Sequence, residues 1–399
     1  MNILFHHRTR GKGAEGVHIR GVTKGLRDIG HNVSILSLPG AEPEAKSSKA
    51  NNDGKNQPKA KLVQSKKSFL VLLANLTKHT PEFVFEFIEI AFNILSVFRL
   101  KKAVKNEKTE LIYERYSLFL VASVWWAKKN NIPIILEVND SSLVHRVRKL
   151  HFVALAKKFE RWIFKNATGL VFISSEFQQI AQREFGEIAP SVVSPNAADL
   201  DAFILDDTKA IQLRQSLNIN DKVVIGYVGA FVHWHGIDWF VDMIVDKLKD
   251  NPEIVLLLIG DGVSYQSINE RVMQSGVESQ VILTGRINHN EVSTYLSAMD
   301  FGILPDSNNY GSPMKLFEFM AMEKGMVAPD FTPITEVVKD NETSWLFPAN
   351  DRQACIDKTL ALVGDKATQR RVGKNARAYI ETERQWKHNA AQIIGLVSS

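Results

Sequence analysis

The sequence has few of the residues that mark a secreted, disulfide-bonded or metal-dependent protein. Cys355 is the only cysteine among 399 residues, so no disulfide can form within the chain and a reducing compartment is expected. The first residues, MNILFHHRTRG, lack the apolar core of a signal peptide, which favours a cytoplasmic location. The chain also has no HExxH motif, no cysteine pair and no convincing DxD context. We therefore expect no bound metal.

The sequence also has little net charge outside one segment. The formal net charge is +5, and residues 41–67 carry seven lysines against three acidic residues, a local excess of +4. The rest of the chain thus carries only +1, which does not indicate a nucleic-acid-binding surface. Residues 41–67 are polar and have no apolar period, and we predict a mobile, Lys-rich surface loop there.

No uninterrupted apolar run is long enough to cross a membrane. The longest apolar stretch, EFVFEFIEIAFNILSVFRLKKAVK (82–105), predicts one long helix that is broken up by Glu82, Glu86, Glu89 and Asn93. Two interpretations remain open for this helix. It is either buried within a domain or partly embedded in a membrane surface beside the Lys-rich loop.

The first 38 residues predict a parallel α/β unit. A strand in NILF is followed by the glycine-rich loop RTRGKGAEG, an amphipathic helix over 17–30 and a strand over 31–38. A glycine-rich turn at a helix N-terminus can hold an anion with its backbone N–H groups. The loop lacks strict GxGxxG spacing, so it predicts either a phosphate site or a plain Rossmann-like turn.

Charged and amide side chains follow the next predicted strands. TELIYERY ends in Glu114 and Arg115, and IPIILEVND ends in Asn139 and Asp140. Ligand-binding groups of parallel sheets gather at the carboxyl ends of strands, which favours these four residues as site candidates. Each of them alone could equally be a loop residue that makes local bonds. TGLVFIS and APSVV predict two more strands, with a capping-box pattern from Ser175 to Gln178 between them.

A second α/β series begins near residue 221. It contains predicted strands in KVVIGYVGAF, EIVLLLIGDG, QVILTGRI, FGILP, MVAPD and TSWLF. Two Rossmann-like units divided near 200–220 predict a cleft between domains, a place that suits elongated, phosphate-bearing ligands.

The stretch GSPMKLFEFMAMEKGMVAPD (311–330) carries the most specific chemistry. Ser312 and Pro313 suit the start of a helix, whose free N–H groups near Met314 and Lys315 would attract an anion. Lys315 could add charge to a diphosphate, and Glu318 lies one turn on, where it could accept ribose hydroxyls. The alternative is a core helix with an ion pair worth only about 0.2–0.5 kcal/mol.

This stretch resembles the signature helix of retaining GT-B glycosyltransferases of family 4. The resemblance runs in order through GAEGVHIRGVTKGLRDIGHNVSIL, IYERY, LEVND, FISSEF, SPNAADLDAF, GYVGAFVHWHGID, LLIGDG, LTGRI, MDFGILP and QWKHNAAQIIGLV. It is closest to the branch that builds bacterial surface polysaccharides. The resemblance implies an α/β fold of GT-B type, with two Rossmann-like domains facing a central cleft. Residues 1–200 and 383–399 would form the acceptor domain, with the C-terminal helix crossing back to it, and 201–382 the nucleotide-sugar domain.

The resemblance also implies roles for individual residues. The donor diphosphate site corresponds to Ser312, Met314 and Lys315, approached from the first domain by Gly13 and Gly16; Glu318 corresponds to the ribose-binding carboxylate, and Arg286 and Ile287 to the base pocket. Asn139, Asp140, Lys315 and His235 are the candidate catalytic residues. Glu114 and Arg115 are the candidate acceptor-binding residues.

Two positions depart from the family pattern. The family has a second carboxylate eight residues before Glu318 that touches the donor sugar, and this chain has Tyr310 there. His235 stands where a phosphate-binding lysine is common, with Ala230 or Phe231 in place of an arginine. These departures leave the donor sugar open.

The function implied is a retaining, hexosyltransferase-type reaction. A sugar would pass from a UDP- or GDP-sugar to a lipid-linked or oligosaccharide acceptor, in the cytoplasm or at the inner-membrane surface. The nucleotide sugar is a substrate, and no cofactor is expected. Two alternatives remain: a catalytically weak GT-B binding or scaffold subunit, and a GT-B-like sugar-nucleotide epimerase.

Overall fold

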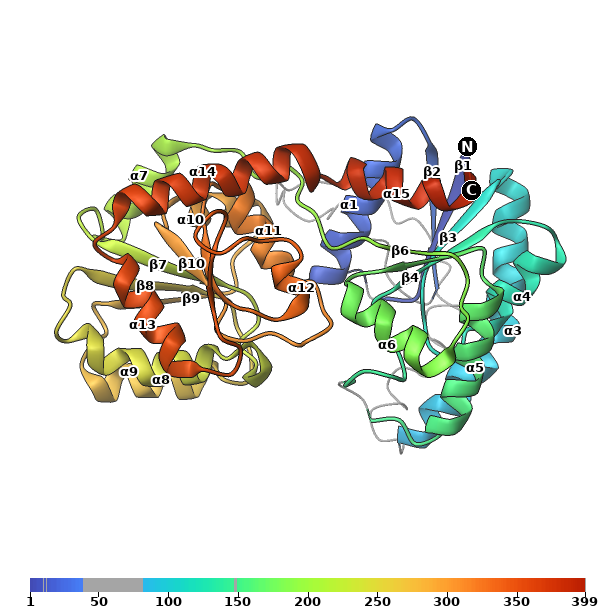
Figure 1. Ribbon diagram of the computed structural model, residues 1–399, viewed down its shortest axis with the longest axis horizontal. Coiled ribbons are helices and arrows are strands. Elements are labelled where there is room, and N and C mark those ends of the chain that lie inside the picture. Colours follow the sequence, from blue (N-terminus) through green and yellow to red (C-terminus); the bar gives the residue numbers. More distant parts are fainter. Residues whose placement is uncertain (10, 12, 39–81, 147–148, 399) are drawn as a thin grey trace, which may run out of the picture.

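The protein consists of two α/β domains side by side, each built on a six-stranded parallel sheet (Figure 1). The computed structural model describes residues 1–398 except 10, 12, 39–81 and 147–148, so the predicted Lys-rich loop lies outside the described residues. The first sheet contains β1 (Asn2–His7), β2 (Asn32–Ser37), β3 (Leu111–Arg115), β4 (Ile134–Val138), β5 (Gly169–Phe172) and β6 (Ser191–Val193). Its order is β2-β1-β3-β4-β5-β6.

Helices cover both faces of the first sheet, because its strands are apolar on both sides. On one face, α1 (Ala14–Asp28) and α15 (Trp386–Ser398) pack on Ile3, Phe5 and Tyr113. On the other, α3 (Glu82–Glu107), α4 (Val121–Lys129), α5 (Val153–Asn166) and α6 (Ser175–Phe185) pack on Leu4 and Ile112. The predicted strands and the helix over 82–105 are confirmed.

The second domain repeats this plan. Its strands are β7 (Val223–Val228), β8 (Ile254–Ile259), β9 (Val281–Gly285), β10 (Phe301–Ile303), β11 (Met326–Pro329) and β12 (Trp345–Phe347), in the order β12-β11-β10-β7-β8-β9. One face packs on α8 (Ile237–Leu248), α9 (Tyr265–Ser275) and α13 (Arg352–Leu362). The other packs on α10 (Val292–Ser297), α11 (Met314–Ala321) and α14 (Lys366–Glu383), and α7 (Asp207–Ser216) contacts α10.

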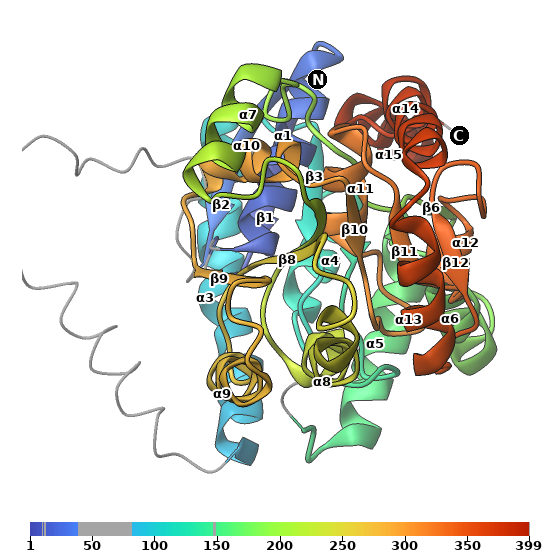
Figure 2. The same ribbon diagram turned by 90° about the vertical axis from the view of Figure 1, so that its left-hand side faces the viewer.

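The chain returns to the first domain at its end. Helix α14 stops at Glu383, and α15 then runs along α1, so both C-terminal helices lie on the same side of the molecule (Figures 1 and 2). Trp386 fits against Gly21 and Gly25 of α1, where a Cβ atom at Gly21 would lie 2.2 Å from the indole ring. These two glycines therefore allow α15 to approach α1 closely.

The structure corrects two predicted helix caps. Pro313 occupies the N-cap position of α11, and Ser312 instead accepts a hydrogen bond from the backbone N–H of Asn196 (2.9 Å). Ser312 is therefore committed to the contact between domains. At α6 the capping side chain is Ser174, which accepts from the N–H of Phe177, and Ser175 is the first helical residue.

Helix α3 is buried on one side only. Leu100 and Val104 face the core, whereas Phe87, Ile94 and Phe98 are exposed. Among the described residues, no helix combines the length and the apolar character that a bilayer crossing needs.

Candidate active site

A cleft of about 740 Å³ lies between the two domains. Its lining comes from the carboxyl ends of strands in both sheets, where the chain order of the strands reverses: between β1 and β3 in the first sheet, and between β7 and β10 in the second. Loops at such a switch point diverge and leave a crevice that ligands occupy. The fold therefore places two binding crevices face to face.

The second-domain wall is built around Lys315 in the first turn of α11. Its ammonium group donates to the hydroxyl of Tyr227 (3.1 Å) and lies 4.3 Å from the centre of that ring. A Cβ atom at Gly229 would lie 2.8 Å from this Nζ atom, so the glycine after β7 makes room for the lysine. The first N–H groups of α11 point out of the helix beside this cation. Together they form a site for a negatively charged group.

Burial moves the pKa values of both Lys315 and Glu318 toward neutral pH. Desolvation lowers the pKa of Lys315 to about 7, with Glu318 opposing the shift. Desolvation likewise raises the pKa of Glu318 to about 7, with Lys315 opposing it. Each group is therefore ready to gain charge when a ligand of opposite charge or a hydrogen-bonding hydroxyl enters the cleft.

His235 lies beside this pair in its neutral form. Desolvation and the charge of Lys315 lower its pKa to about 4. Its Nδ1 atom lies 2.9 Å from the carbonyl oxygen of Ala230, which can only accept, so Nδ1 carries the proton. The Nε2 atom is then a hydrogen-bond acceptor. In this state His235 does not supply a positive charge to a phosphate, unlike the lysine common at its position in the family.

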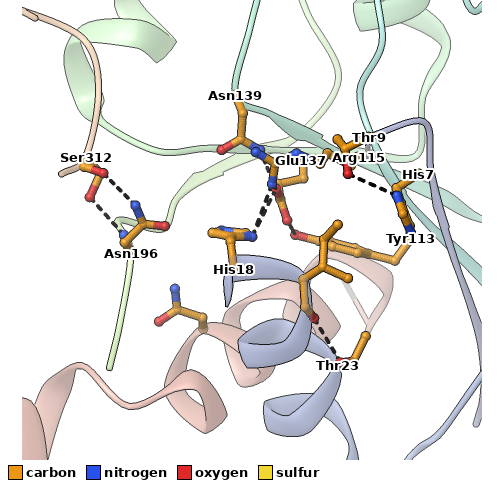
Figure 3. Close-up of polar contacts among 12 residues, drawn as sticks. His7, Thr9, His18, Thr23, Tyr113, Arg115, Glu137, Asn139, Asn196 and Ser312 are labelled. Atoms are coloured by element: carbon orange, nitrogen blue, oxygen red, sulfur yellow. Dashed lines mark hydrogen bonds and ion pairs between the residues drawn. The ribbon is translucent and has the colours of Figure 1, made fainter. Parts of the chain in front are cut away.

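The first-domain wall is organised by the buried carboxylate of Glu137 (Figure 3). Arg115 donates to its Oε1 atom (2.6 Å), Tyr113 donates to Oε2 (2.9 Å), and Asn139 donates through its amide nitrogen. Burial opposes ionisation of Glu137, but His18, Arg115 and these donors lower its pKa overall. The carboxylate thus fixes two cleft-lining side chains, Arg115 and Asn139.

His18 of α1 completes this wall. Its Nδ1 atom lies 3.2 Å from Nη1 of Arg115 and 3.4 Å from Oε1 of Glu137. Because arginine only donates, Nδ1 accepts and Nε2 carries the proton. Burial lowers the pKa of His18 to about 4, so the ring is neutral. Trp386 of α15 packs edge-on against it at 5.0 Å between ring centres. His18 is therefore a rigid hydrogen-bond donor at the edge of the cleft.

Asn196 joins the two walls. Its backbone N–H and its side-chain amide donate to Ser312 (2.9 and 2.5 Å), as Figure 3 shows. Its Oδ1 atom is buried in the cleft lining and has no hydrogen-bond partner among the residues that the structure describes. An unpaired buried oxygen is costly, and a ligand hydroxyl would satisfy it.

Most of the sequence-predicted site residues line the cleft. These are Gly13, Arg115, Asn139, His235, Arg286, Ile287, Tyr310, Ser312, Met314, Lys315 and Glu318. Arg286 is highly exposed and lies 3.5 Å from a carboxylate oxygen of Asp261. Tyr310 faces the first domain: its hydroxyl donates to the carbonyl of His145 (3.1 Å), and its ring packs on Phe177.

Three predicted residues lie outside the cleft lining. Glu114 is buried, with its two oxygens bonded to His6 (2.5 Å) and Ser123 (2.7 Å), so it cannot reach an acceptor. Asp140 turns toward Arg146 (2.8 Å). Gly16 packs under the loop before α1, where a Cβ atom would lie 2.3 Å from the carbonyl oxygen of Gly11.

Sequence reasoning overlooked His18, Glu137 and Asn196. One signal was available: residues two apart share a face of a strand, so Glu137 belongs with Asn139. Nothing comparable marked His18 or Asn196, whose positions depend on contacts between distant segments. Among the residues described, no group of three or more His, Cys, Asp or Glu side chains could hold a metal ion.

Two Rossmann-like domains with their switch points across one cleft define the GT-B class. Comparison with known families agrees: residues 15–202 match the Glycosyltransferase Family 4 model, and 222–365 match the model described as Glycosyl transferases group 1. The chain thus has the GT-B fold and contains a Glycosyltransferase Family 4 domain followed by a glycosyl transferases group 1 domain.

Individual relatives are distant. Alpha-D-kanosaminyltransferase of Streptomyces kanamyceticus is 20% identical over 61% of this chain and 65% of its own length. The capsular polysaccharide biosynthesis glycosyltransferase CapM of Staphylococcus aureus is 24% identical over 48% of this chain and 49% of its own. This chain thus spans less than two thirds of each relative. A crystal structure of Anabaena HepE in complex with UDP matches over the full length of both chains, with a TM-score of 0.73 and 16% identity.

Proposed function

We propose that the protein transfers a sugar from a nucleotide diphosphate sugar, with a UDP-sugar as the first candidate donor. The observation that carries this proposal is the desolvated Lys315 beside the N-terminal N–H groups of α11, with Glu318 one turn further into the cleft. A diphosphate suits the first group and a ribose the second. The UDP-bound HepE structure, which shares the fold, supports this assignment.

The chemistry required of the second domain is stabilisation of a leaving group. As the bond between the sugar and the diphosphate breaks, negative charge builds on the phosphate oxygen. Preformed N–H donors and a cation stabilise that charge without reorganising. Lys315 supplies the cation because the diphosphate raises its pKa and restores its proton. Arg286 adds a second positive charge at the rim of the cleft.

The first domain would hold the acceptor. The Nε2 proton of His18 and the guanidinium of Arg115 offer donors, while the side chain of Asn196 offers an unpaired oxygen. This mixture suits a hydroxyl-rich ligand such as a saccharide. In a retaining reaction the acceptor hydroxyl approaches the face that the diphosphate leaves, so no protein nucleophile is required.

The product class we propose is a bacterial surface polysaccharide, built on a lipid-linked or oligosaccharide acceptor. CapM is named for capsular polysaccharide biosynthesis, and its 24% identity extends over about half of this chain. The mixed donor and acceptor groups on the first-domain wall are compatible with such a substrate.

One alternative has a specific observation in its favour. Tyr310 replaces the carboxylate that touches the donor sugar, and His235 is neutral where a cation is common. A GT-B subunit that binds nucleotide without turning it over would tolerate both changes. Turnover measurements separate this scaffold role from the enzyme.

The test is nucleotide-sugar binding by calorimetry, followed by nucleotide release with and without saccharide acceptors. We expect Glu318→Gln to weaken UDP-glucose binding by about tenfold or more, because it replaces a charged acceptor of ribose hydroxyls. The thermal midpoint should not fall, since glutamine mimics the protonated form that burial favours. An equal loss of stability and affinity would mean that Glu318 is structural. Absence of binding to every UDP-, GDP- and ADP-sugar would refute the proposed function.

A second variant separates acceptor from donor. His18→Ala should lower transfer to an acceptor by about tenfold or more. The variant loses the hydrogen bond that the neutral, fixed ring of His18 would donate to the acceptor. Binding of the nucleotide sugar and its slow hydrolysis without acceptor should stay close to the parent values. Loss of nucleotide binding in this variant would place His18 in the donor site instead.

A further inference from the structure

Helix α3 presents an apolar face to the outside of the molecule. Phe83, Phe87, Ile94 and Phe98 are 42%, 55%, 68% and 70% exposed. At 3.6 residues per turn, these four side chains fall within a sector of roughly 60° around the helix axis. Leu100, on another side of the helix, is buried in the first domain. The exposed sector is therefore not needed to pack α3 onto its own sheet.

The apolar surface continues onto the segment that precedes α5. Phe87 packs edge-on against Phe152, with 5.2 Å between ring centres. Val153 and Leu155 are also exposed, at 42% and 38%. The buried carboxylate of Glu86 fixes this junction by accepting from the backbone N–H groups of His151 (2.6 Å) and Phe152 (3.0 Å). Contiguous apolar surface of this kind marks an interaction site.

Basic side chains extend the same sector toward the end of the helix. Lys101 and Lys105 follow Phe98 on the same side, and both are exposed, as is the neighbouring Lys102. Glu107 is the acidic residue of α3 at this end. It is exposed, but at 3.6 residues per turn it lies roughly 120° or more around the helix axis from the apolar sector. Nearer the start of the helix, Glu86 is buried and Glu89 is half-exposed. Figure 1 shows α3 on the outer side of the first domain, away from the second domain.

We propose that this face of α3 docks on an anionic lipid bilayer. The aromatic and aliphatic side chains would enter the boundary between headgroups and acyl chains, and the lysines would contact lipid phosphates. A second copy of the chain fits this face less well. Two α3 faces packed together would place lysines against lysines or bury lysines against phenylalanines, and protein interfaces are depleted in lysine. The proposal does not depend on the transfer reaction, although it would bring the cleft close to a lipid-linked acceptor.

The test is flotation of the full chain, without donor or acceptor, on phosphatidylcholine vesicles prepared with and without phosphatidylglycerol. We expect the protein to float with the anionic vesicles and to be released from them by salt. The triple variant Phe87→Ser, Ile94→Ser, Phe98→Ser should reduce the partition by at least about tenfold, since it removes three apolar side chains from the contact. Lys101→Glu with Lys105→Glu should abolish the preference for anionic lipid.

A matched control comes from the second domain. Val263 and Met273 are 74% and 59% exposed there, and Val263→Ser with Met273→Ser removes two exposed apolar side chains without touching α3. This control should float as the parent does, and circular dichroism should show that all variants are folded. The proposal is overturned if the parent does not float. It is also overturned if the α3 and control variants float equally, or if α3 substitution instead dissolves a homodimer seen by light scattering.

Discussion

At the scale of single residues, the cleft is dominated by a lysine whose charge depends on what it binds. Lys315 is desolvated against Tyr227, and its pKa falls to about 7. A lysine at the surface would remain charged at any physiological pH and would be hydrated. Burial instead keeps water away from the cation, so that an incoming diphosphate meets a weakly hydrated and fixed partner.

This arrangement predicts a pH dependence of donor binding. A bound diphosphate raises the pKa of Lys315 above about 7, so binding takes up a proton above that pH, where Glu318 is already ionised. Above that pH the free lysine is deprotonated, and the affinity for UDP-glucose should fall by up to about tenfold per pH unit. UDP-glucose has no phosphate that titrates near neutrality, so the slope reports on the protein. Calorimetry across neutral pH, in buffers of different ionisation enthalpy, measures both the affinity and the proton uptake.

Lys315→Met provides the control for this dependence. It keeps an unbranched side chain against Tyr227 and removes the group that titrates above about pH 7. The fall in affinity above that pH should therefore disappear, whereas the dependence below it, where Glu318 must lose its proton, should remain. A fall above that pH that persists in this variant would assign the proton uptake to another group, and the account given for Lys315 would be wrong.

At the scale of elements, the segment between β10 and α11 serves two surfaces at once. Lys315, just after it, faces the donor side of the cleft. Tyr310 faces the first domain, where its hydroxyl bonds to the carbonyl of His145 and its own carbonyl accepts from Ser174 (2.6 Å). The position at which the family carries a sugar-binding carboxylate is thus used here for contact between domains.

Substitution of Tyr310 tests this change of use. Tyr310→Ala removes the ring from Phe177 and should raise the KM for the donor several-fold, because the segment is no longer anchored. Tyr310→Phe should retain most of the donor affinity, since only one hydrogen bond is lost, worth about 1 kcal/mol. Tyr310→Glu should resemble the alanine variant. If the glutamate variant instead binds UDP-glucose more tightly than the parent, the position is still a sugar subsite.

The elements themselves were largely predictable, whereas the partners of their side chains were not. Strand and helix periodicity identified both sheets and placed Lys315 and Glu318 on one helix. The carboxyl ends of strands correctly indicated where Arg115 and Asn139 would lie.

The same rule placed Glu114 at the cleft, but adjacent strand residues face opposite sides, and Glu114 turns inward to His6. Ser312 fitted the local preference for a cap, yet a contact with Asn196, 116 residues away, took precedence.

At the scale of the whole molecule, a few polar contacts hold the domains around the cleft. Glu336, just after the short helix α12 (Thr332–Thr335) of the second domain, accepts from the backbone N–H of Ser175 (3.1 Å) and from its hydroxyl. Because Ser175 begins α6, this carboxylate also interacts with the positive end of a first-domain helix. Where the chain returns, Asn389 of α15 donates to the carbonyl of Pro195 (2.7 Å), a contact within the first domain. The Glu336 contact can separate when the domains open, whereas the Asn389 bond fixes the returning chain to the first domain.

Removing the Glu336 contact should therefore favour an open molecule. We expect Glu336→Ala to increase the radius of gyration of the ligand-free protein in small-angle X-ray scattering. Saturating UDP-glucose should restore the radius of gyration of the closed protein. The donor binds to the second-domain wall, and closure of the cleft brings the first-domain wall into contact with it as well. The KM for the donor should rise several-fold, since binding must then also provide the free energy of closure. Glu342→Gln is a suitable control, because Glu342 is a surface carboxylate of the same domain that pairs with the exposed Lys339. A control that opens as far as Glu336→Ala, or a Glu336→Ala protein that scatters like the parent without ligand, would show that this contact does not hold the domains together.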